Sequence, residues 1–253
     1  MMVDLAADLG EGYGTYRVGD DDALLGIVTS ANIACGFHAG DPAIMHDTVA
    51  ECVRRGVQVG AHPGLHDRYG FGRRLIGLTA HEVYTDVLYQ LGALDAFARA
   101  RGTRIRHVTP HGQLGNAAVR DRTWADAIVA AITAFDADVT VVALAGALTD
   151  AAAAAGLSTA VLGLADRAYQ EDGSLVPRST PGAVLTDESE VTGRVVRMVT
   201  EGMVTAASGR DIPLRPDTVL LHGDTPGAVV LAKAVRAALA DAGVAIRQLA
   251  ALV

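Results

Sequence analysis

Histidine and acidic side chains recur at one place in the pattern of this chain, directly after its short apolar segments. These side chains transfer protons, orient water and bind cations. One polar residue after a strand is usually a turn or cap former, but here six apolar segments are followed in this way. The first pair is Asp8, near the end of 3–9, and Glu11 after it, and the last is His222, near the end of 218–223, and Asp224 after it. The others are His38 and Asp41 after 32–35, His62 and Asp67 after 57–61, His111 and Asn116 after 104–108, and Asp166 and Arg167 after 157–163. This repetition predicts one shared site.

Asp8 and Glu11 form the first motif, VDLAADLGEG over 3–12, which is followed by further glycines. Two carboxyl groups can divide general-acid and general-base roles when their environments separate their pKa values. The simpler interpretation is an Asx turn at Asp8 and a solvated Glu11.

The second motif joins 30–42 (SANIACGFHAGDP) to 59–74 (VGAHPGLHDRYGFGRR). Small residues around His38 let the backbone approach a ligand closely, and a proline follows His62. The glycines of 70–72 with Arg73 and Arg74 would suit a carboxylate or phosphate, although exposed arginine pairs are common.

The third motif, RHVTPHGQLGN over 106–116, places His111 after a strand, whereas we expect His107 to point into the packing. We also expect Cys35, at the end of an apolar strand, to lie in the core rather than act as a nucleophile. Asp8 with several histidines could hold a divalent metal, but no ligand pair has a recognised short spacing. The sequence lacks P-loop, HExxH, GxSxG and GxGxxG motifs.

Strands and helices alternate along the chain, which predicts parallel strands joined by helical crossovers. About seven such units favour a closed β/α barrel, a single domain over 1–253, with the polar residues gathered at the carboxyl ends of its strands. Residues 163–184 should form a long loop and 202–217 a hairpin. The expected strands are 3–9, 32–35, 57–61, 104–108, 139–144, 157–163 and 218–223, and the expected helices are 20–29, 41–55, 79–101, 117–134, 148–155, 187–201 and 225–242.

The composition excludes several classes of protein. The 253 residues are 50% hydrophobic and 20% charged, with a net charge of −8, as in a folded acidic protein. Without a run of Lys or Arg we expect no nucleic-acid partner. The longest uncharged apolar stretch, 151–165, is too short to cross a membrane, and the acidic start is no secretory signal. Two cysteines are too few for a disulfide scaffold. A cytoplasmic location is expected.

The motifs resemble those of the LamB/YcsF family, whose best-known members are the A subunits of the bacterial ATP-dependent 5-oxoprolinase. The resemblance runs nearly end to end and keeps the family order. The matching blocks are DLAADLGEG, SANIACGFHAGDP, GAHPG, FGRR, YQLGAL (89–94), HVTPHGQLGN, LADRAYQEDGSLVPRS (164–179) and LHGD (221–224).

This resemblance implies a seven-stranded β/α barrel of the glycoside hydrolase/deacetylase type. It implies conversion of 5-oxoproline to L-glutamate coupled to ATP hydrolysis, in which B and C subunits activate the lactam by phosphorylation. We expect Asp8 or His62 to act as the base that aligns water, and His38 and His111 to donate protons or stabilise an oxyanion. Arg73, Arg74 or Arg167 would receive the anionic ends of the substrate. The further substrate-binding candidates are Glu11, Asn32, Asp41, Asp166, His222 and Asp224.

The chain departs from the family pattern at Ala6 (usually Asn), Thr109 (Lys), Gln113 (Ala) and Gly115 (Tyr). Loss of the ammonium group at Thr109 predicts either a weakened 5-oxoprolinase or a divergent paralogue acting on a related lactam or amide. Two alternatives stay open: a stand-alone metal-dependent amide or deacetylase-type hydrolase, and a non-catalytic partner of a carboxylase-like complex. The sequence also leaves open a homo-oligomer, a bound metal and a direct contact with ATP.

Overall fold

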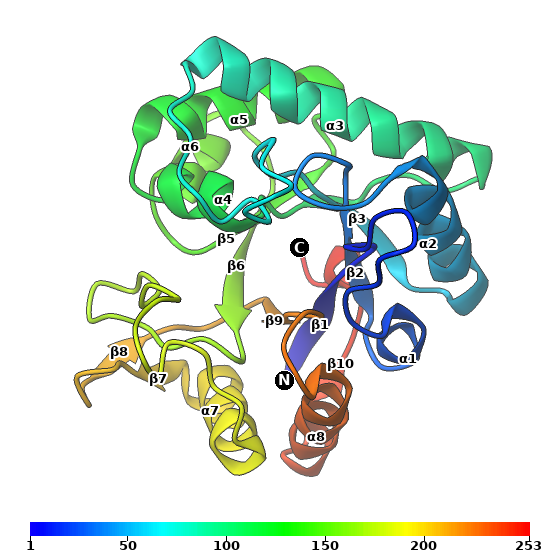
Figure 1. The fold of residues 1–253 in the computed structure, drawn as a ribbon. Coiled ribbons are helices and arrows are strands. Elements are labelled where there is room, and N and C mark those ends of the chain that lie inside the picture. The colour runs from blue at the N-terminus through cyan, green and yellow to red at the C-terminus, as the bar shows by residue number, and fades with distance from the viewer.

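The computed structural model describes residues 1–253, and a closed ring of parallel strands lies at its centre (Figure 1). The first strand pairs with the second on one side and with the last strand of the ring on the other, which closes the barrel. The predicted seven-stranded β/α barrel is therefore confirmed. Its strands are, in order, β1 (Met2–Leu9), β2 (Ser30–Ala34), β3 (Gln58–His62), β4 (His107–Val108), β5 (Thr140–Ala143), β6 (Thr159–Leu164) and β9 (Thr218–Leu221).

Helices surround this barrel on its outside (Figure 1). They are α1 (Asp21–Leu25), α2 (Pro42–Arg55), α3 (Ala80–Ala100), α4 (Gly112–Ala118), α5 (Arg122–Phe135), α6 (Ala147–Ala154), α7 (Glu188–Glu201) and α8 (Ala228–Asp241). The expected hairpin is present as the antiparallel pair β7 (Met203–Thr205) and β8 (Asp211–Pro213). None of the helices combines the length and the apolar character needed to span a lipid bilayer.

Local signals account for several helix boundaries. Asp41 caps α2, with a proline in its first turn, and Thr79 forms a capping box with Glu82 at the start of α3. The single helix expected over 117–134 was wrong: the structure has α4 and α5 there. The chain turns between them at Asp121. Its side chain accepts hydrogen bonds from the backbone N–H groups of Thr123 and Trp124, which caps the start of a new helix.

Two further elements were not expected from the sequence. The short strand β10 (Ala245–Ile246) pairs with the start of β1, and η1 (Leu249–Ala251) is a 3₁₀ turn that follows it. Strand β4 is also shorter than the expected 104–108. Such short pieces carry too few residues to show a period of their own.

Alternation along β1 divides its side chains between two environments. Leu5 and Leu9 are fully buried in the main hydrophobic cluster, whereas Asp4 and Asp8 make polar contacts with neighbouring strands. Residues two apart on a strand share a face, so both aspartates point to the same side of the sheet. The strand thereby carries one carboxylate near each end of the barrel.

Candidate active site

A cavity of about 570 Å³ opens at the carboxyl end of the barrel strands. Its lining residues come from β1, β3, β5, β6 and β9 and from the loops that follow β3, β4 and β6. Parallel strands present their carboxyl ends at one rim, which is why residues far apart in the chain meet there. Of the residues singled out from the sequence, those that line this cavity are Asp8, His62, Arg73, Thr109, His111, Gln113, Gly115, Asn116, Arg167 and His222.

Asp8 lies near the end of β1, and its neighbours hold its carboxylate at the cavity wall. The side-chain Nδ2 of Asn32 donates to Oδ1 of Asp8 at 3.0 Å, and Nε2 of His62 lies 3.4 Å from the same oxygen. Burial alone raises the pKa of Asp8, but His62, His222 and the Asn32 hydrogen bond outweigh it and bring this pKa below its ordinary value. Asp8 is therefore an ionised carboxylate even though it is almost fully buried.

Hydrogen bonds to the backbone fix the tautomers of His62 and His111. Nδ1 of His62 lies 2.5 Å from the carbonyl oxygen of Thr109, and Nε2 of His111 lies 2.8 Å from that of Phe71. A carbonyl oxygen only accepts, so both of these nitrogens carry the proton. The two remaining nitrogens, Nε2 of His62 and Nδ1 of His111, face each other at 2.9 Å. In two neutral rings both would carry lone pairs, so this contact needs either an additional proton on one ring or a metal ion bound to both.

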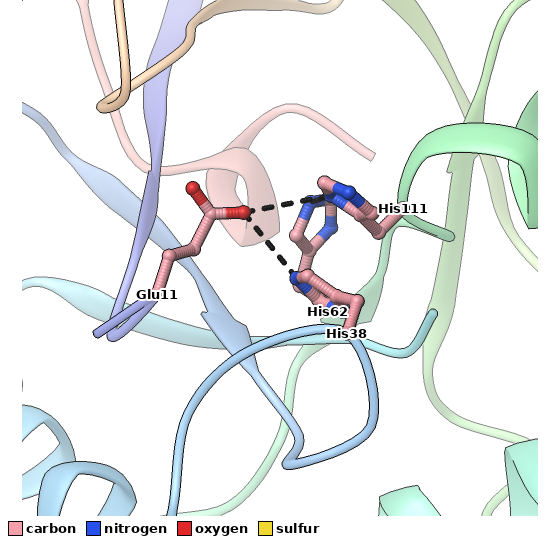
Figure 2. Close-up of side chains that lie close together, drawn as sticks. All are labelled: Glu11, His38, His62 and His111. Atoms are coloured by element: carbon pink, nitrogen blue, oxygen red, sulfur yellow. Dashed lines mark hydrogen bonds and ion pairs between the residues drawn. The ribbon is translucent and has the colours of Figure 1, made fainter. Parts of the chain in front are cut away.

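Glu11 and His38 join these two rings in a buried group of four (Figure 2). Oε1 of Glu11 is 3.3 Å from Nε2 of His38 and 3.5 Å from Nδ1 of His111. The His38 ring stacks on His111 with their centroids 3.7 Å apart. Burial, together with the charges of Asp8 and Asp224, raises the pKa of Glu11 well above its ordinary value. Burial and the neighbouring imidazoles lower the pKa values of His38 and His111.

Four arginines also line the cavity. Arg120 is paired with Asp172, and the other three are Arg73, Arg167 and Arg178. Arg73 forms an ion pair of 2.7 Å with Asp224. Arg167 donates to the carbonyl oxygens of Val176 at 2.6 Å and Ala183 at 3.1 Å, which fixes its position. Burial and the nearby charge of Arg178 lower the pKa of Arg167 to about 10. The rim is therefore a place where an anionic group would relieve the repulsion between the buried Arg167 and the partly buried Arg73 and Arg178.

Arg178 was missed by reasoning from the sequence. It lies in the irregular segment after β6, where no periodicity indicates which side chains point inward. Burial and the charge of Arg73 lower the pKa of Arg178. The one signal in the sequence was its place inside the motif at 164–179.

His222 is held by a second carboxylate behind the cavity wall. Its Nδ1 lies 2.7 Å from Oδ1 of Asp166, whose other oxygen accepts the Thr225 hydroxyl at 2.9 Å. Burial raises the pKa of Asp166, but the charge and the hydrogen bond of His222 outweigh this and lower it overall. The ionised Asp166 orients the His222 ring and leaves Nε2 as the nitrogen free for other partners.

Two predicted site residues lie elsewhere. The carboxylate of Asp41 caps α2, because it accepts hydrogen bonds of 2.9 Å from the backbone N–H groups of Ala43 and Ile44. Arg74 pairs with Asp67, and 59% of its side chain is exposed. The structure therefore brings neither of them into the cavity, because each is occupied by a local partner. Five others contact the lining residues from behind: Glu11, Asn32, His38, Asp166 and Asp224.

Two expectations about buried residues are confirmed. Cys35 is in the core, and burial raises the pKa of its thiol to about 12, so it is no nucleophile. His107 points into the barrel, where Nε2 lies 2.8 Å from Oδ1 of Asn32 and Nδ1 lies 3.1 Å from the Gln58 amide. Asn32 thus connects His107 to Asp8.

Comparisons with known proteins give one consistent result. The family model described as LamB/YcsF matches residues 3–253. The chain is 53% identical to the 5-oxoprolinase A subunit of Rhodopseudomonas palustris (strain BisB5), over 96% of each chain. It is 50% identical to the 5-oxoprolinase A subunit of Methylococcus capsulatus, over 98% of this chain and 95% of that one. The crystal structure of a lactam utilization protein from Thermus thermophilus superimposes with a TM-score of 0.92 at 46% identity, covering 98% of this chain and 100% of that one.

Proposed function

Because this chain belongs to the LamB/YcsF family, we propose that it acts as the A subunit of a 5-oxoprolinase. In this proposal it opens the ring of 5-oxoproline to give L-glutamate, in a reaction coupled to ATP hydrolysis and completed by B and C subunits. Relatives of about half-identical sequence are named as A subunits of 5-oxoprolinase, and a structural relative is a lactam utilization protein. Naming those relatives as subunits supports a complex with other chains.

The observation that carries the proposal is the meeting of an ionised carboxylate, paired imidazoles and the guanidinium groups of Arg73, Arg167 and Arg178 at one cavity. Hydrolysis of a lactam needs a group that orients water, positive charge where the carbonyl oxygen becomes negative, and a proton for the leaving nitrogen. 5-Oxoproline also carries a carboxylate, and an activated form would carry a phosphate. Cations near the reacting carbon suit both of these anions.

We assign Asp8 as the base that orients the attacking water. Its lowered pKa keeps it ionised, and it lies between His62 and His222 at the cavity wall. The positively charged contact between His62 and His111 would stabilise negative charge on the oxygen of the carbonyl group. In its imidazolium form His222, held by Asp166 through Nδ1, would give the proton on Nε2 to the ring nitrogen after the C–N bond breaks.

An unstrained amide is a poor electrophile, which gives a physical reason for coupling the reaction to ATP. Phosphorylation of the lactam oxygen would make the ring carbon more reactive. The sequence of this chain has no P-loop, so we assign the phosphorylation step to the partner subunits and the ring-opening step to this barrel. Arg73, Arg167 and Arg178 would then hold the phosphate and the carboxylate.

Reconstitution with matched B and C subunits tests this proposal. We expect formation of L-glutamate from 5-oxoproline only when all three subunits and ATP are present, with one ATP hydrolysed for each ring opened. Omission of this chain should abolish glutamate formation, and its replacement by the Asp8→Asn variant should slow it by roughly 10²–10⁴-fold. Full glutamate formation by the B and C subunits alone would refute the assignment.

A stand-alone amide hydrolase is the second candidate, and the Glu11, His38, His62 and His111 group favours it because such a group can hold a metal. It predicts hydrolysis of an amide or lactam by the isolated chain, without ATP. The same reconstitution separates the two, since activity of this chain alone would support the second candidate.

A further inference from the structure

Hydrogen bonding between two neutral rings does not explain the contact between His62 and His111. A neutral imidazole has one N–H group. His62 donates its N–H to the carbonyl oxygen of Thr109, and His111 donates its N–H to that of Phe71. The nitrogens left over are 2.9 Å apart. Two lone pairs at this distance repel each other, and water cannot enter a contact of this length. A positive charge must therefore be shared between the two nitrogens.

Two further ligand atoms lie at the same point. The carboxylate of Glu11 and a ring nitrogen of His38 belong to the same group, and all four ligand atoms lie within 4.8 Å of one another. Ligand atoms around a tetrahedral Zn²⁺ are about 3.3–3.5 Å apart, because its bonds to nitrogen and oxygen are about 2.0–2.2 Å long. The contacts of Glu11 with His38 (3.3 Å) and with His111 (3.5 Å) fall in this range, whereas the nitrogens of His62 and His111 (2.9 Å) would have to move slightly apart around an ion.

The surroundings of the rings also match those of metal ligands. Metal-bound histidines usually donate their second ring N–H to a backbone carbonyl or a carboxylate, which fixes the ring. His62 and His111 both do so. Glycines leave room for the rings: a Cβ atom at Gly64 would lie 2.4 Å from Nδ1 of His38, and one at Gly72 would lie 2.8 Å from both His38 and His111.

We propose that Glu11, His38, His62 and His111 bind one divalent transition-metal ion. Three imidazoles and one carboxylate favour Zn²⁺ or chemically similar ions such as Co²⁺ over Mg²⁺ and Ca²⁺, which prefer sites made only of oxygen ligands. All four residues are at most 3% exposed, so a bound ion would lie below the cavity floor and not in open solvent. Asp8 lies beside this site, with Oδ1 3.4 Å from Nε2 of His62 and hydrogen-bonded to Asn32, and it does not belong to the converging group of four.

A proton shared by His62 and His111 is the competing explanation. It would account for their contact but not for the convergence of Glu11 and His38. One divalent cation satisfies the three rings and the carboxylate together.

Direct titration of the isolated chain tests the metal site without any enzyme assay. After treatment with a chelator, the protein should bind one equivalent of Zn²⁺, measured by competition with a chromophoric chelator. Co²⁺ should bind at the same stoichiometry and give the visible absorption of a low-coordinate complex, which Zn²⁺ then removes. Because only the metal and this chain are present, failure of the 5-oxoprolinase proposal would leave this result unaffected.

Variants locate the ion. Glu11→Gln and His111→Gln should each weaken Zn²⁺ binding by roughly 100-fold or more, since even loss of an outer partner costs 10–100-fold. His66→Gln, which changes an exposed histidine near the site, should keep the affinity of the unaltered protein. Asp8→Asn should also keep the metal while slowing glutamate formation.

Three outcomes would overturn the proposal. They are the absence of Zn²⁺ and Co²⁺ binding to the unaltered chain, equal binding by His111→Gln and the His66→Gln control, and a titration that shows only a proton shared by His62 and His111. The last is measured by the ¹⁵N shifts of the two rings, which respond differently to a proton and to a metal.

Discussion

Asp8 and Glu11 are three residues apart in the chain, yet their carboxyl groups behave in opposite ways. Both are buried, and burial raises the pKa of each. For Asp8, the effects of His62, His222 and the Asn32 amide outweigh this rise in pKa. For Glu11, the negative charges of Asp8 and Asp224 raise the pKa further. The first therefore stays ionised and the second is protonated more readily, unless a cation joins its histidine neighbours.

Asp8→Asn isolates the role of the ionised carboxylate. The amide keeps the size of the side chain but cannot accept a proton from water, so we expect kcat to fall by roughly 10²–10⁴-fold. The KM for 5-oxoproline should change little, because the arginines that bind the anions are untouched. Steady-state glutamate formation by the reconstituted complex measures both. A kcat within a few-fold of the unaltered enzyme would show that another group orients the water.

Arg178→Met tests the anion-binding role of the rim. We expect KM for 5-oxoproline to rise by roughly 10–100-fold, since a hydrogen bond to a charged group contributes about 1.5–3 kcal/mol. The value of kcat should change less than KM. Arg210→Met is the matched control, because Arg210 pairs with Glu171 outside the cavity and should leave both constants unchanged. Equal changes in KM for the two variants would show that Arg178 does not bind the substrate.

At the scale of elements, the close packing of α4 against the loop after β4 sets the shape of the cavity. A Cβ atom at Gly115 would lie 2.6 Å from the carbonyl oxygen of Pro110. Helix α4 could approach this loop so closely only because position 115 has no side chain. The Tyr that the family resemblance leads one to expect at this position would require the backbone to shift, so this departure changes the element and not only one side chain.

Gly115→Ala should therefore destabilise the protein by about 1–3 kcal/mol, the usual cost of forcing extra atoms into a packed region. Gly92→Ala is the matched control, since Gly92 lies on an exposed face of α3 with open space around it. It should stabilise the protein by about 0.5–1 kcal/mol, because alanine is the better helix former. Urea unfolding of both variants measures these changes. A Gly115→Ala variant with the same free energy of unfolding as the unaltered protein would show that the loop shifts to make room for the added methyl group without a cost in stability.

At the scale of the whole molecule, Asp4 links the ends of the chain across the barrel seam. Its carboxylate accepts the hydroxyls of Thr29 at 2.8 Å and Ser30 at 2.7 Å, from the start of β2, and that of Thr218 at 2.6 Å, from β9. Burial raises the pKa of Asp4, and these hydroxyls offset the rise only in part. The seam of the barrel therefore contains a buried carboxyl group whose pKa is raised above its ordinary value.

This raised pKa has a definite sign for stability. The folded state holds the Asp4 proton to higher pH than the unfolded chain, so its contribution to stability is complete below about pH 4 and is lost as pH rises through the folded pKa. Asp4→Asn lacks this titration. The free energy of unfolding of the unaltered protein minus that of the variant should fall as the pH rises above about 4. Urea unfolding at several pH values measures it, and a constant or rising difference would contradict the assignment.

The sequence alone determined the barrel and the rim that carries the site. Alternating strand and helix patterns are local, and parallel strands must present their ends together, so Asp8, His62, His111 and His222 could be grouped without coordinates. The motifs likewise placed the chain in its family. Asp41 and Arg74 show the limit of this reasoning, because a residue after a strand is as often a cap or a local ion pair.

Only the tertiary structure decided how the grouped residues interact. The closure of β1 on β9, the position of Arg178 at the cavity and the close approach of α4 depend on contacts between distant segments. The tautomers of His62 and His111 are set by two carbonyl oxygens that no spacing in the sequence reveals. Proton positions and pKa values depend on distances of a few ångströms through space, and the order of residues along a chain does not specify those distances.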